Sequence, residues 1–190
     1  MNIVTCYPPC QHFSKMSNRS MYLAKYRNTT TQRAHFAIFI PNAEYDRAGL
    51  SQDYRSSPCK GTKIHVVGEP MLAGFQLEIK HNYECDTSQD LNELVHIGHV
   101  NPDHVHIPSS SKFREGDNPH GRLESEALKV PPPPNGQNIR APIDGVTTRR
   151  CQEWTMEYLS HLVAKGLVHS STLSIVQGER DAPNFGIFGQ

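Results

Sequence analysis

The chain has 190 residues, a length typical of one domain with a hydrophobic core. Lysine and arginine together number 19, as do aspartate and glutamate, so the net charge is zero and a broad nucleic-acid-binding face is not expected. Hydrophobic residues make up 36% of the chain, and no apolar run approaches the roughly 18 residues that a membrane-spanning helix needs.

The first elements that the sequence predicts are β-strands. Residues 34–40 are β-branched and aromatic and end at a Pro-Asn pair, which is typical of a buried strand. Residues 60–68 are bounded by glycines, and residues 74–83 alternate apolar and polar side chains with period two. We expect residues 92–100 to form a fourth strand and residues 105–107 a short fifth one.

Two stretches without periodicity lie outside these elements. Residues 1–20 are expected to be a loose N-terminal extension, which leaves residues 21–190 as a single domain. Residues 108–147 are polar and proline-rich, and the four successive prolines at 131–134 exclude a helix or a central strand. We therefore predict a long connecting loop over residues 108–147.

The helix with the clearest signal spans residues 149–166. Its apolar side chains recur at helical spacing on one face, Thr147 or Thr148 can cap its start, and Gly166 supplies its end. The sequence as a whole thus predicts an α+β fold, an antiparallel sheet with a C-terminal helix packed on it.

The cysteines are odd in number and irregularly spaced: Cys6, Cys10, Cys59, Cys85 and Cys151. This spacing, with an N-terminus that lacks the features of a secretory signal, favours free thiols and a cytoplasmic location. Cys151 lies in the first turn of the predicted helix, on its buried face. The helix dipole and the neighbouring Arg149 and Arg150 favour a thiolate, so we expect its pKa to fall below the ordinary value of about 8.5.

Histidines on two neighbouring strands are candidate partners for this thiol. His35 opens the first predicted strand and His65 lies inside the second. A thiolate nucleophile needs a base within hydrogen-bond reach, and the base needs a third group that orients it. Taken singly, each of the three is equally well explained as a core residue. Taken together, they predict an acyl-transfer or hydrolytic site with Cys151 as nucleophile and no cofactor.

The segments His-Phe-Ala-Ile-Phe-Ile, Lys-Ile-His-Val-Val-Gly and Arg-Arg-Cys-Gln-Glu-Trp carry a family resemblance in this order. They resemble the circularly permuted papain-like fold, which includes the lecithin:retinol acyltransferase family and the desumoylating isopeptidases. The resemblance covers about residues 33–68 and 148–165. It implies a triad in which Cys151 is the nucleophile, His35 the base and His65 the orienting group.

The residues around the cysteine differ from that family's pattern. Arg150 stands where the family has asparagine, and Glu153-Trp154 where it has His-Phe. We expect Gln152 and Arg150 to support the oxyanion, beside the backbone N–H groups of the helix start. Arg149 and Trp154 are candidate substrate-binding residues, although Trp154 also fits the core.

The expected substrate is a small acyl or aminoacyl compound, and two alternatives stay open. One is an aminoacyl-tRNA-dependent synthase of arginine-containing cyclodipeptides, which would need tRNA as a partner and a local basic patch. The candidates for that patch are Arg140, Arg149, Arg150, Lys60 and Lys63. The other is a non-catalytic interaction domain that presents the prolines at 131–134 as a docking segment.

A cluster of histidines begins within the fourth predicted strand and continues past its end: His96, His99, His104 and His106. Neutral imidazoles bind zinc or copper, but this spacing fits no standard zinc module. The sequence therefore predicts a polar strand and turn here, without a metal.

Overall fold

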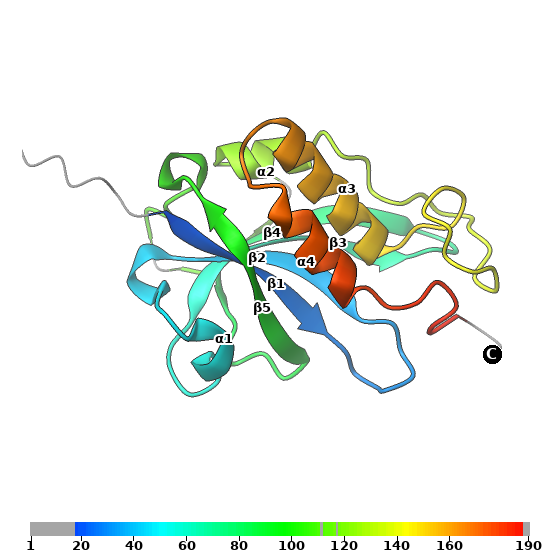
Figure 1. The fold of residues 1–190 in the computed structure, drawn as a ribbon, viewed down its shortest axis with the longest axis horizontal. Helices are drawn as coiled ribbons and strands as arrows, with labels where there is room; N and C mark the ends of the chain where they lie inside the picture. The colour runs from blue at the N-terminus through cyan, green and yellow to red at the C-terminus, as the bar shows by residue number, and fades with distance from the viewer. Residues whose placement is uncertain (1–17, 111, 117, 188–190) are drawn as a thin grey trace, which may run out of the picture.

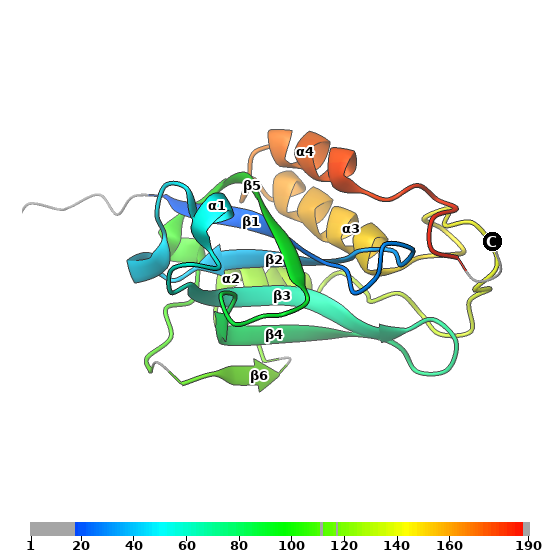
Figure 2. The ribbon, with the colours of Figure 1, turned by 90° about the horizontal axis from the view of Figure 1, so that it is seen from below.

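The computed structural model describes residues 18–110, 112–116 and 118–187. An antiparallel sheet in the order β5-β1-β2-β3-β4-β6 forms its centre, and helices lie against it (Figures 1 and 2). The strands are β1 (Arg19–Tyr26), β2 (His35–Pro41), β3 (Lys60–Glu69), β4 (Gly74–Glu84), β5 (Leu91–Val100) and β6 (Arg114–Gly116). The helices are α1 (Leu50–Asp53), α2 (Arg122–Ala127), α3 (Cys151–Ala164) and α4 (Ser171–Glu179). The predicted α+β class is confirmed.

Each face of the sheet has its own core. The helices α3 and α4 lie side by side across one face, where α3 packs on β2 and β3 and α4 packs on β5 (Figure 1). There Phe36 and Ile38 of β2 share a buried cluster with Trp154 of α3. On the opposite face Phe39 of β2 is buried with Leu50 of α1. Because β2 is covered on both sides, its sequence is apolar throughout rather than alternating.

The strand β1 is an element that the sequence did not predict. It begins at Arg19, so the predicted loose extension over residues 1–20 overlaps the first two residues of this strand. Residues 1–17 of that extension lie outside the described residues. The strand pairs with β5 on one side and β2 on the other, and most of its side chains are buried. An interior strand of this kind shows no period-two alternation, which explains why the pattern was missed.

The predicted loop over residues 108–147 contains two elements, β6 and α2. The short strand predicted at residues 105–107 is wrong, because the chain there leaves a 3-10 turn, Pro102–His104. Within the proline run, Pro133 is buried and its carbonyl oxygen accepts the N–H of Phe75 at 3.1 Å. The proline run is thus hydrogen-bonded to the start of β4. This contact does not fit the use of the run as a docking segment.

The helix α3 begins at Cys151 rather than at Arg149. Its N-cap is Arg150, whose backbone N–H donates to Oε2 of Glu153 at 2.9 Å. The predicted threonine cap is wrong, since Thr148 bonds to Asp144 instead. The helical stretch closes at Gly166, which has a φ of 68° and ends the helix as predicted.

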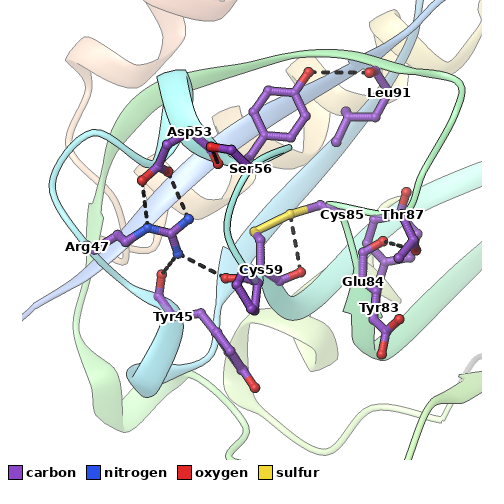
Figure 3. The surroundings of a disulfide bond; sticks show 12 residues. Tyr45, Arg47, Asp53, Ser56, Cys59, Tyr83, Glu84, Cys85, Thr87 and Leu91 are labelled. Carbon is purple, nitrogen blue, oxygen red and sulfur yellow. Dashed lines mark hydrogen bonds and ion pairs between the residues drawn. A yellow bond between two sulfur atoms is a disulfide. The ribbon is translucent and has the colours of Figure 1, made fainter.

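A disulfide joins Cys59 and Cys85, so the prediction of free thiols is wrong for this pair (Figure 3). Both cysteines are fully buried in the core on the α1 face. Beside them Arg47 pairs with Asp53 at 2.8 Å and closes the loop that carries α1. Cys151 is a free thiol, and Cys6 and Cys10 lie outside the described residues. Within the described part of the chain, no helix is long and apolar enough to cross a membrane.

We expect the disulfide to contribute a measurable share of the free energy of unfolding. It spans a sequence separation of 26 residues, and constraining an unfolded loop of that size contributes about 3 kcal/mol. We expect the Cys59→Ala/Cys85→Ala double variant to lose about that much free energy of unfolding in urea. A reducing agent should lower the wild-type value and leave the double variant unchanged. A wild-type unfolding curve that does not respond to the reductant would contradict the bond.

Candidate functional site

The thiol of Cys151 lies where the start of α3 meets the start of β2. Its Sγ is 3.8 Å from the carbonyl oxygen of Ala34, and the backbone N–H groups of Phe36 and Gln152 point to the sulfur. The residue is 8% exposed. Cys151 and His35 line the same cavity of about 380 Å³. The predicted nucleophile and the predicted base therefore face one space, and a contact within about 4 Å between them stays a prediction.

The side chain of Gln152 clamps α3 to the segment before β2. Its Nε2 donates to the carbonyl oxygen of Ala34 at 2.9 Å and to Oδ2 of Asp181 at 2.8 Å. Its Oε1 accepts the N–H of Asp181 at 3.0 Å, and Asp181 in turn accepts the N–H of Ala34 at 2.8 Å. Gln152 is fully buried with its amide committed, so the predicted oxyanion role of this side chain does not fit the structure.

A buried carboxylate, Glu153, ties three further groups to the first turn of α3. Its Oε1 accepts from Arg33 at 2.8 Å and from Arg180 at 2.6 Å, and its Oε2 accepts the backbone N–H of Arg150. The carboxylate is only 2% exposed. The charge of Glu153 is therefore used to hold α3, the segment before β2 and the C-terminal segment together.

A chain of hydrogen bonds runs from His35 across the sheet. Nε2 of His35 lies 2.7 Å from Nδ1 of His65, and Nε2 of His65 lies 2.6 Å from Oε2 of Glu78. The strand register places His65 of β3 directly opposite Glu78 of β4. The predicted pairing of the two histidines is present, and Glu78 extends it.

The carboxylate of Glu78 determines which nitrogen donates and which accepts in each of these hydrogen bonds. Because a carboxylate only accepts, the Nε2 of His65 must donate to it. The neutral His65 ring then accepts at Nδ1, so Nε2 of His35 donates to it. This arrangement leaves the lone pair of His35 on Nδ1, the nitrogen that the chain does not use. A neutral His35 is thereby set up to accept a proton.

Both histidines are held neutral by their surroundings. Burial, with a smaller contribution from His65, lowers the pKa of His35 to about 3. Burial and the nearby positive charge of Lys63 place the pKa of His65 well below its ordinary value. At neutral pH the pair therefore carries no charge, which agrees with the proton directions that Glu78 imposes.

The pKa of Cys151 shifts in the direction opposite to the one that its position predicts. Burial raises it to about 11, and the charge of Glu153 adds to the rise. Of the two neighbouring arginines, Arg149 is paired with Glu157, and the arginine charge that lowers the pKa of Cys151 is that of Arg33. The backbone N–H groups of Phe36 and Gln152 lower the pKa of Cys151, but burial away from water raises it by more. Cys151 is a thiol at neutral pH.

Two of the predicted substrate-binding residues lie away from the cavity. Trp154 is fully buried, stacks on Tyr158 and donates its Nε1–H to the carbonyl oxygen of Val130 at 3.0 Å. Arg149 is committed to Glu157 and does not line the cavity. The predicted substrate contact therefore does not fit either residue. Arg150 does line the cavity, beside Cys151.

The structure separates the predicted histidine cluster into two groups. His96 and His99 pack together on β5 with ring centroids 4.8 Å apart. His106 instead packs against His81 and His120, at 5.0 and 4.9 Å. Among the described residues, no three His, Cys, Asp or Glu side chains are placed to hold a metal ion.

Sequence reasoning missed Glu78 and Asp181. Glu78 stands in an alternating strand, where polar residues normally face water, so only its register with His65 reveals its part in the site. Asp181 lies in a stretch without periodicity. No signal in the sequence marks its contact with Gln152, which is 29 residues away.

Comparison with known proteins identifies the family. A family model described as a family of unknown function (DUF6540) matches residues 21–169, so the chain belongs to that family. No curated protein and no solved structure matches the chain.

The raised pKa of Cys151 predicts how its reactivity changes with pH. Since a thiol with a pKa of about 11 ionises late, the rate of alkylation by iodoacetamide should keep rising above the ordinary thiol pKa of about 8.5. Free cysteine, measured in parallel, should level off there. Mass spectrometry of the Cys151 peptide gives the rate. A plateau below the free-cysteine midpoint would instead indicate a preformed thiolate–imidazolium pair.

Proposed function

We propose that this member of the family is a thiol enzyme that transfers or hydrolyses acyl groups through an acyl-cysteine. Cys151 is the nucleophile, His35 is the base, and His65 with Glu78 orients the base. One observation carries the proposal: the Glu78–His65–His35 chain of hydrogen bonds leaves Nδ1 of His35 as the acceptor. A core histidine needs no such two-step relay that ends at a cavity lined by a free cysteine.

The proposed reaction starts from neutral groups. The Sγ of Cys151 attacks the carbonyl carbon of the substrate while its proton passes to Nδ1 of His35. The resulting imidazolium is stabilised through His65 by the Glu78 carboxylate. Collapse of the tetrahedral intermediate breaks the bond to the leaving group, which takes the proton from His35. An acyl-cysteine thioester remains.

The helix start supplies a place for the oxyanion. The N–H group of Cys151 lies in the first turn of α3, where no helical carbonyl can accept it. Donors of this kind stabilise the negative charge that develops on the carbonyl oxygen. In the second half of the reaction His35 removes a proton from the acceptor, which is water in a hydrolase and an amine or hydroxyl in a transferase.

The order of the three residues supports a likeness to the permuted papain-like enzymes, and we keep that likeness as part of the proposal. The aminoacyl-tRNA alternative has less support. Of its proposed basic patch, Lys63 is buried against Tyr26 and Tyr83, and Lys60 and Arg149 are paired with carboxylates. The cytoplasmic location rests on the N-terminal sequence alone, and the buried disulfide argues against it, because disulfides persist in oxidising compartments.

The proposed roles predict a graded series of variants. Formation of the acyl adduct on Cys151, measured by mass spectrometry with an activated ester as donor, should vanish in Cys151→Ala. His35→Ala should slow it by about 10²- to 10⁴-fold, because the proton acceptor is lost. His65→Ala should be more severe than His65→Asn, which keeps a hydrogen-bonding amide. Glu78→Gln should cost about 10- to 100-fold, the usual effect of removing such a support.

The matched control for Glu78→Gln is Glu84→Gln, a change at an exposed glutamate of the same strand that pairs with Lys60. It should leave acylation unchanged. Melting temperatures of all variants separate lost chemistry from lost folding. Wild-type acylation rates in both His65→Ala and Glu78→Gln would show that the relay is a core feature without a catalytic role.

A further inference from the structure

Arg150 lines the Cys151 cavity, and no carboxylate among the described residues forms an ion pair with its guanidinium. Its Nη1 donates to Oε1 of Gln137 at 2.6 Å and to the carbonyl oxygen of Arg149 at 2.9 Å, and both acceptors are neutral. Glu153 attracts it at longer range, but that carboxylate binds the backbone N–H of Arg150 and two other guanidiniums. Arg150 is half-buried, and burial lowers its pKa.

The other charged side chains that face the cavity are already bound by neighbouring groups. Arg33 pairs with Glu153 and also donates to the carbonyl oxygen of Ala182. Glu69 accepts the backbone N–H groups of the β3–β4 turn, at Met71, Leu72 and Ala73, and this lowers its pKa. His35 is neutral, as shown above. Among the described residues that line the cavity, Arg150 is therefore the cation that no carboxylate binds, and it lies next to the nucleophile.

The rest of the cavity wall strengthens the attraction between this charge and an anion. Most of its side chains are apolar: Pro70, Met71, Phe75, Ile139, Ile143 and Ile187. A charged group in such surroundings interacts with an opposite charge more strongly than it would in water. Arginine also presents a planar fork of donors that fits a carboxylate.

We infer that the acyl substrate of this site carries a carboxylate near its reacting carbonyl, and that Arg150 binds this carboxylate. The inference rests on the proposed function, since it places the substrate against Cys151. The apolar wall then receives the uncharged remainder of the acyl group. Arg150 is thus a specificity-determining residue, in a position where the resembling family has asparagine.

Two small alkylating reagents test the charge preference directly. Iodoacetate and iodoacetamide react by the same displacement, in which the Cys151 sulfur bonds to carbon, iodide leaves and the thiol proton is released. They differ in the carboxylate that iodoacetate carries. The ratio of the two rates at the Cys151 peptide, divided by the ratio for free cysteine in the same buffer, isolates the effect of the site.

We expect the wild-type ratio to favour iodoacetate by about 10- to 100-fold over free cysteine, the effect of one hydrogen-bonded charge pair. Arg150→Gln should return the ratio close to that of free cysteine. The control is Arg149→Gln, which removes the neighbouring charge that pairs with Glu157 outside the cavity and should leave the ratio unchanged. Added salt should lower the ratio of the wild type.

The outcomes separate this inference from the proposed function. A wild-type ratio equal to that of free cysteine, or an equal fall in both arginine variants, overturns the role of Arg150 while Cys151 remains reactive. Failure of both reagents to label folded wild-type protein, with labelling restored in urea, overturns the proposed function and this inference together. The wild-type ratio needs no variant, so a poorly folded Arg150→Gln protein does not prevent the test.

Discussion

The carbonyl oxygen of Ala34 is the point on which the candidate site depends. It accepts the side-chain amide of Gln152 and faces the thiol of Cys151, although these residues are more than 100 positions away in the chain. Asp181 completes the clamp by accepting both the N–H of Ala34 and the amide of Gln152. Because His35 is the next residue after Ala34, the same contact that docks α3 on the sheet places the cysteine at the cavity that the histidine also lines.

Burial away from water is the second constraint, and it acts on both Cys151 and His35. The burial that raises the pKa of Cys151 also lowers the pKa of His35, so each is held in its neutral form. A neutral pair avoids the cost of isolated buried charges while the site is empty. In the proposed reaction, the proton moves when a substrate carbonyl is present to accept the electrons of sulfur. Among the described residues of the cavity wall, Arg150 is the arginine that no carboxylate binds, which suits it to an anionic ligand.

The sequence was sufficient for the elements whose patterns are local. Four strands, β2 to β5, and the helix α3 each have a clear apolar run or periodicity, and the cysteine at the helix start was recognisable. The strand β1 and the helices α2 and α4 were missed, because a strand buried on both faces and short helices have no distinctive period. The Cys59–Cys85 bond could not be deduced, since spacing does not determine cysteine pairing.

The geometry of the site could not be predicted from the sequence, because it depends on the register of the strands. At the end of the β3–β4 pair, Gly61 lies opposite Tyr83, but further along Lys63 lies opposite Lys80, so β4 has one extra residue. Continued without this bulge, the first register would place His65 opposite the apolar Ile79 rather than Glu78.

The extra residue is accommodated at Asn82, which has a left-handed φ of 54°. Asparagine tolerates that conformation better than most residues, and the Asn82 side chain is fixed by bonds to the carbonyl oxygens of Ser110 and Lys112. The orientation of His35 thus depends on a bulge one strand beyond its neighbour. Because the bulge places Glu78 beside His65, it sets the direction of the hydrogen bonds along the relay and leaves Nδ1 of His35 as the acceptor nitrogen.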